Sequence, residues 1–190
     1  MNADALSDLV LAMVCVALAA ANWRTRPALA QACGMIGLAA SFGVLRYFEI
    51  DFALGPHRFF SLLAACAAYP LLAVAVRWPD GDVGRRANAA ARFFLLSGAL
   101  AVALHLSGLT FWRQLVPVIS VLMTVVTAIR LKKSRPIFGS LLLVFSLLVA
   151  GFGQAPDFVI GPLNAIQAMH YLMAAGFALL AWPLKLTKRP

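Results

Sequence analysis

Charged residues are scarce in this 190-residue chain. Asp, Glu, Lys and Arg make up only 12% of it, hydrophobic residues make up 63%, and the mean hydropathy is +0.88. Soluble domains usually contain about 25% charged residues. The connections between the apolar runs are also short, which leaves no room for a soluble domain. The composition therefore predicts an all-α polytopic membrane protein, with a single transmembrane domain over residues 1–190.

Motifs of well-known catalytic sites are absent as well. The chain has no His-x-x-x-His pair, no glycine-rich phosphate loop, no cysteine cluster and no readable Ser-His-Asp arrangement. Its three cysteines, Cys15, Cys33 and Cys66, lie singly inside apolar segments. We expect them to be buried as small apolar side chains and not to form disulfides or bind metal.

The net charge of +9 would suggest nucleic acid as a partner if the protein were soluble. Here the basic residues flank the apolar segments, where they act as topology signals and contact anionic lipid headgroups. We therefore expect membrane lipids as partners and no nucleic acid.

Seven apolar segments approach the length that crosses a bilayer. They are residues 5–23, 28–48, 57–78, 87–107, 111–131, 137–152 and 164–182. The first apolar run, counted from Ala3 to Trp23, carries Asp4 and Asp8 and has no basic residue before it, which predicts a retained helix and not a signal peptide. Pro70 predicts a kink in the third. The sequence thus predicts a bundle of seven transmembrane helices.

The basic residues predict the orientation of this bundle. Thirteen of the 16 Lys and Arg residues lie on the side of the loops after the first, third and fifth segments, and the other three are Arg46, Arg58 and Arg113. The side rich in Lys and Arg faces the cytoplasm. We therefore expect the N-terminus outside and the C-terminus in the cytoplasm, in a plasma membrane that would be the inner membrane of a bacterium.

The last segment, residues 164–182, carries polar side chains near its start. Gln167 shares a helix face with Asn164, His170 and Tyr171, because residues three and four apart are neighbours. Lipid cannot satisfy such groups, so this face should point into the bundle. Gln167, Asn164 and Tyr171 are candidate ligand- or cofactor-binding residues, and a purely structural hydrogen bond between helices is the alternative.

All three histidines fall in the predicted outer half: His57, His105 and His170. Three imidazoles from three helices could bind zinc and leave a position open for water, which the metal would activate. Asp51 or Glu49 would be the catalytic base beside it, and Asp157 is a further carboxylate on this side. Haem held by His105 and His170 is the alternative cofactor.

Structural explanations exist for several of these residues. Arg46 and Glu49 are three apart and could form a local ion pair. His57 could be an ordinary interfacial residue. Asp4 and Asp8 could complement the dipole of the first helix.

The predicted layout resembles the seven-helix membrane hydrolases typified by alkaline ceramidases and adiponectin receptors. The shared features are seven short helices, an outside N-terminus, and histidines near one membrane face with carboxylates beside them. That family binds zinc through three histidines, with a serine and an aspartate nearby. Its final helix usually has two histidines four residues apart, whereas His170 is followed at that distance by Ala174. The resemblance covers the overall layout and implies a metal-dependent hydrolase of a lipid or amphiphile.

Two functions follow from these patterns. The first is a hydrolase with an outward-facing cavity on which His57, His105 and His170 converge. The second is a non-enzymatic module that binds a small molecule, haem or a partner membrane protein in the same cavity.

Overall fold

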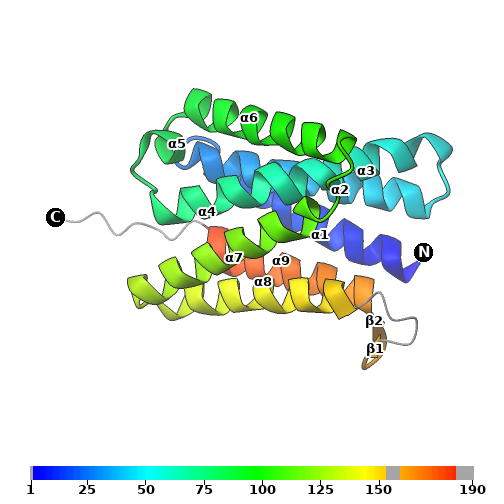
Figure 1. Cartoon of the computed structure of the whole chain (residues 1–190). Helices are drawn as coiled ribbons and strands as arrows, with labels where there is room; N and C mark the ends of the chain where they lie inside the picture. The colour runs from blue at the N-terminus through cyan, green and yellow to red at the C-terminus, as the bar shows by residue number, and fades with distance from the viewer. Residues whose placement is uncertain (1, 153–158, 183–190) are drawn as a thin grey trace.

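The computed structural model describes residues 2–152 and 159–182. Its elements are α1 (Ala3–Asn22), α2 (Pro27–Tyr47), η1 (Asp51–Ala53), α3 (Leu54–Leu63), η2 (Ala64–Ala68), α4 (Tyr69–Arg77), α5 (Asp82–Arg85), α6 (Ala87–Leu106), α7 (Trp112–Leu131), α8 (Ser134–Phe152), β1 (Val159–Ile160), β2 (Leu163–Asn164) and α9 (Ala165–Ala181). The long helices run side by side along one common direction (Figure 1).

Six described helices are long and apolar enough to cross a membrane, where Asp51–Arg77 counts as one continuous rod. Helix α9 is also apolar but has only 17 residues. An all-α membrane protein, predicted from composition, is thereby confirmed. Most predicted segment boundaries agree with the helices to within a few residues.

Two connections and one helix start differ from the sequence prediction. The connection at residues 79–86, between the third and fourth predicted segments, contains the short helix α5. The loop before α9 includes the antiparallel pair β1–β2. The third rod begins at Asp51 and not at His57, because a 3-10 turn precedes α3 and continues into it.

Pro70 has a local consequence in the third rod. It lies at the start of α4, directly after a π-helical turn, η2. Proline lacks an N–H and its ring clashes with the carbonyl four residues earlier, so the regular hydrogen-bond ladder cannot pass through it. The chain accommodates the break by widening one turn, as single π turns often do. This widened turn places Ala64 and Ala65 at a cavity described below.

Large apolar side chains cover the outside of the bundle. Many lie on α6, α7 and α8: Leu95, Leu96, Leu100, Ile119, Leu122, Val126, Phe138, Phe145 and Leu148. Ser and Thr residues of these helices donate their hydroxyls to carbonyls three or four residues earlier in the same helix, as Ser97, Thr127 and Ser146 do. Such bonds satisfy hydroxyl groups where lipid offers no partner.

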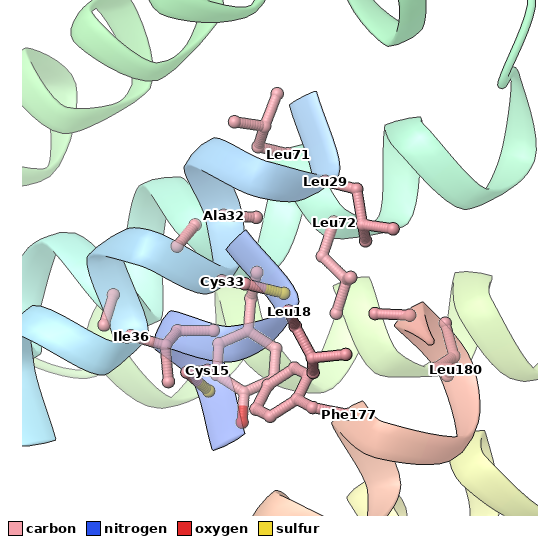
Figure 2. Close-up of a cluster of buried hydrophobic side chains, with 14 of the residues drawn as sticks. Cys15, Leu18, Leu29, Ala32, Cys33, Ile36, Leu71, Leu72, Phe177 and Leu180 are labelled. Carbon is pink, nitrogen blue, oxygen red and sulfur yellow. The ribbon is translucent and has the colours of Figure 1, made fainter. Parts of the chain in front are cut away.

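The main apolar core lies where α1, α2, α4 and α9 meet. Figure 2 shows side chains from all four helices in contact there: Cys15, Leu18, Leu29, Ala32, Cys33, Ile36, Leu71, Leu72, Phe177 and Leu180. All three cysteines of the chain are free and buried, as the sequence predicts. Helix α1 packs against both α2 and α9, so the first helix of the bundle lies next to the last one.

Glycines set the distance between α8 and α9. A Cβ at Gly139 would lie 2.9 Å from the carbonyl oxygen of Gly176, and one at Gly176 would lie 3.0 Å from the carbonyl oxygen of Gly139. The two backbones approach one another as closely as small residues allow in membrane helix pairs.

We therefore expect Gly139→Ala to separate α8 from α9 and to lower the stability of the protein by about 1–3 kcal/mol, because the added methyl meets backbone and not a flexible side chain. Gly151→Ala is the control in the same helix, since a Cβ there meets no atom within 4 Å. Thermal unfolding in detergent measures both. Equal melting temperatures for the two variants would contradict the close packing of α8 on α9.

Candidate functional site

Polar side chains join α1 to α9 at the end of the bundle where both helices begin, which we call the N-terminal end. Asp4 accepts hydrogen bonds from the side-chain amides of Asn164 (2.8 Å) and Gln167 (2.7 Å), both to its Oδ1. The amide oxygens of these two residues accept backbone N–H groups in a capping box at the start of α9. Their NH₂ groups are therefore left to face Asp4, and its carboxylate suits them as an acceptor.

One turn deeper, His170 lies between Ser7 and Asp8 of α1. Its Nδ1 is 3.1 Å from Oγ of Ser7, and its Nε2 is 3.4 Å from Oδ1 of Asp8. His170 is 9% exposed, Asp8 is 2% exposed and Ser7 is fully buried. The predicted inward orientation of Gln167 and His170 is thus confirmed.

The hydrogen-bond pattern indicates where protons lie in this group. Ser7 donates its hydroxyl hydrogen to the carbonyl oxygen of Asp4 (2.8 Å), so its oxygen is free to accept Nδ1–H from His170. The other ring nitrogen then faces the carboxyl group of Asp8. If neither group carried a proton, the lone pair of Nε2 would face the negative charge of the Asp8 carboxylate, and the two would repel each other in this buried place. One proton shared between Nε2 and the Asp8 carboxyl group is therefore favoured.

Gly43 of α2 makes room for Asp8. A Cβ at Gly43 would overlap the Asp8 carboxyl group, with its carbon Cγ at 2.7 Å. The Asp8 side chain therefore lies directly on the backbone of α2, which supports it from the side away from α9.

Asp8 and His170 line a cavity of about 550 Å³ between six rods of the bundle. Most of its wall is apolar, formed by residues such as Leu11, Ile36, Pro117 and Met173. Its other polar or ionisable lining residues are His57, Ser61, Tyr69, Arg113 and Gln114. Its size and its lining fit a site for a small organic molecule.

The cavity opens between α7 and α8. The lining residues that are exposed all belong to these two helices: Arg113, Gln114, Val118 and Gly151. The helices meet at the turn after Leu131 and separate toward the N-terminal end of the bundle (Figure 1). A cation and an amide therefore lie at the rim of the cavity, near the start of α7 and the end of α8.

His57 lines this cavity, and among the described residues only its Nδ1 has a hydrogen-bond partner. Its Nδ1 lies 3.2 Å from the carbonyl oxygen of Ala39, so Nδ1 carries the hydrogen and donates it. The lone pair of a neutral His57 then lies on Nε2. His57 is consequently a proton acceptor, whereas Asp8 and His170 share a proton.

The structure brings together some of the residues predicted for a site, and not others. His57 and His170 line the cavity, whereas His105 on α6 is exposed and does not line it. Asp51 and Glu49 are exposed and also lie outside its lining. Asn164 and Gln167 bind Asp4, and the partly buried Tyr171 does not line the cavity. Asp157 lies outside the described residues.

The three histidines therefore do not converge on one cavity in this structure, since His105 lies outside the lining. Within residues 2–152 and 159–182 there is no group of three His, Cys, Asp or Glu side chains arranged to hold a metal. Both ring nitrogens of His170 already face partners, which leaves this residue without a free lone pair for a metal. Zinc or haem binding stays a prediction, which metal analysis and the absorbance spectrum of the purified protein would test.

Asp4, Ser7 and Asp8 are the members of the site that sequence reasoning did not assign to it. The two carboxylates were explained by the helix dipole alone. Their spacing could have indicated this role. Residues 4, 7 and 8 share one face of a helix, and residues 164, 167 and 170 share one face of another. Two matching polar faces in so apolar a chain indicate that they contact each other.

Comparison of the chain with protein-family models, curated proteins and solved structures gives no match. The resemblance to membrane hydrolases stays a prediction, and the function has to be argued from the site.

We expect Asp4→Asn to destabilise the protein by about 1–3 kcal/mol, because a neutral amide oxygen is a weaker acceptor than the carboxylate oxygen that the two NH₂ groups share. Thermal or denaturant unfolding in detergent measures the change. Asp82→Asn is the control, since it removes the same charge from an ion pair with Arg86 that is about three-quarters exposed. Exposed pairs contribute little, so this variant should unfold like the wild type.

Proposed function

We propose that this protein crosses the membrane seven times and binds an anionic, single-chain amphiphile in the cavity between its helices. The observation that carries this proposal is an apolar cavity with a cation at its mouth. Apolar walls suit a hydrocarbon chain, and Arg113 suits an anionic head such as a carboxylate. No carboxylate among the described residues pairs with Arg113, which leaves its charge available to a ligand.

The direction of the mouth supports a ligand that comes from lipid. Because the exposed lining residues lie on α7 and α8, a molecule in the bilayer can enter sideways without crossing water. Seven spans follow if α9 crosses with the other six helices, which its packing along α1 and α8 supports. The distribution of Lys and Arg supports an orientation with the mouth in the outer half of a plasma membrane and the C-terminus in the cytoplasm.

Binding of decanoate to the purified protein in lipid nanodiscs tests this function. We expect saturable binding, and we expect Arg113→Gln to raise the Kd about tenfold, which is the effect of losing about 1.4 kcal/mol from a charge-assisted hydrogen bond. Equilibrium dialysis with labelled decanoate measures the Kd.

Arg58→Gln is the matched control, since Arg58 is exposed near the same end of the bundle but does not line the cavity. Decanol, which lacks the charge, should bind equally to the wild type and to Arg113→Gln. Absence of saturable decanoate binding to the wild type would refute the proposal.

Hydrolysis of a bound ester is a second candidate function, favoured by the two different proton states in the cavity wall. His57 can accept a proton from water while the water oxygen bonds to the acyl carbon. As the bond to the leaving alcohol breaks, the proton shared by Asp8 and His170 can pass to the alcohol oxygen. A base and an acid in one cavity are the groups that ester hydrolysis needs.

Release of decanoate from decanoyl-lysophosphatidylcholine would reveal this activity. If it occurs, His57→Gln and His170→Gln should each lower kcat by about 100-fold or more. His105→Gln should leave it unchanged, because His105 does not line the cavity. An equal loss in His105→Gln would instead favour the three-histidine zinc site predicted from the sequence.

A further inference from the structure

The side chain of Ser61, in helix α3, departs from the pattern that the other helical hydroxyls follow. Every other Ser or Thr beyond the first turn of a described helix donates its hydroxyl to a carbonyl three or four residues earlier in the same helix, as Ser41, Thr124 and Ser146 do. The Ser61 hydroxyl makes no such bond, and it makes no other hydrogen bond to a described residue. A polar group left unpaired in an apolar helix needs an explanation.

A molecule in the cavity can reach this hydroxyl. Ser61 lines the cavity and is partly exposed. The buried polar side-chain atoms that lack a partner among the described residues are Oδ1 of Asn22 and the hydroxyl of Tyr69, and the Ser61 hydroxyl is not one of them. The Ser61 hydroxyl is therefore a contact point for a polar group of a ligand, or for a water molecule that such a group displaces.

An acceptor nitrogen lies one helical turn from this donor. His57 precedes Ser61 by four residues in α3, so the two share one helix face, and both line the cavity. Because Nδ1 of His57 donates to the carbonyl oxygen of Ala39, its Nε2 is the acceptor. Side chains at this spacing have Cβ atoms about 6 Å apart and can both reach one oxygen atom. A hydroxyl group fits such a pair, since it donates to His57 and accepts from Ser61.

The cation at the mouth lies close to this pair. Sγ of Cys66 is 4.0 Å from the carbonyl oxygen of Trp112, the residue before Arg113. Cys66 follows Ser61 by five residues, which is about 7 Å along the rod. Helix α7 runs in the same direction as this rod (Figure 1), and long side chains of a helix point back toward its N-terminus. The Arg113 side chain therefore extends from the level of Cys66 toward the level of Ser61.

We propose that Ser61 and His57 bind a hydroxyl group of the ligand that lies a few bonds from its anionic group. This inference rests on the proposed amphiphile binding and names the class of ligand, which is a long-chain hydroxy acid. Arg113 binds the acid group, Ser61 and His57 bind the nearby hydroxyl, and the apolar wall covers the chain.

Two probes and one variant test this inference. The probes are decanoate and 3-hydroxydecanoate, which differ only in the hydroxyl near the acid group. For the wild type in nanodiscs we expect 3-hydroxydecanoate to bind about tenfold more tightly, the effect of two neutral hydrogen bonds formed in exchange for bonds to water. In Ser61→Ala this preference should fall to about threefold or less, because only the bond to His57 remains. The Kd of decanoate should stay the same, which also shows that the variant is folded.

Ser97→Ala is the control and should keep the preference, since the Ser97 hydroxyl bonds to its own helix and does not line the cavity. A third probe, 3-oxodecanoate, can accept from Ser61 but cannot donate to His57, so it should bind more weakly than 3-hydroxydecanoate.

Three results would overturn the inference and leave the proposed function standing. They are equal binding of decanoate and 3-hydroxydecanoate to the wild type, a full preference that survives in Ser61→Ala, and equal binding of the hydroxy and oxo acids. If none of the probes binds saturably, the proposed function fails and this inference fails with it.

Discussion

Hydrocarbon offers no hydrogen-bond partner, and this constraint explains the arrangement of polar groups in the protein. Hydroxyls on lipid-covered helices bond back to their own helix, as in Ser97 and Thr127. Longer polar side chains cannot do so and form hydrogen bonds with residues of another helix instead. Most of these contacts join α1 to α9. Asp4 accepts hydrogen bonds from two side-chain amides, and His170 lies between Ser7 and Asp8.

This polar contact between the first and last helices also shapes the cavity. It holds α9 against α1 at the N-terminal end of the bundle, while glycines hold α8 against α9. Helix α8 is therefore tied to α9, and α7 packs against α4 and the π-helical turn as well as against α8. Toward the N-terminal end α7 and α8 separate (Figure 1), and residues of both helices line the cavity.

The sequence allowed the membrane class, most helix boundaries and the inward face of α9 to be predicted, because length, apolarity and helical spacing are local properties. The polar contact of α9 with α1 was not predicted, since adjacency of distant segments depends on packing. His105 shows a further limit. A short connection indicates that two helices are neighbours, but it does not determine how each is rotated about its axis, and His105 is exposed. The place of Tyr69 in the cavity wall was not predicted either, because it depends on the break in helical hydrogen bonding that Pro70 imposes.

The distribution of protons across the cavity follows from the same constraint. A buried histidine with one nitrogen on a carbonyl oxygen, as in His57, has its tautomer determined by the backbone. His170 has its tautomer determined by Ser7, whose only hydrogen is already used by Asp4. Each imidazole is thus oriented by a fixed hydrogen-bond partner, which leaves the cavity with one acceptor nitrogen and one shared proton at separate points of its wall. Preorganised groups of this kind require no rearrangement when a ligand arrives, and that property serves selective binding as well as proton transfer.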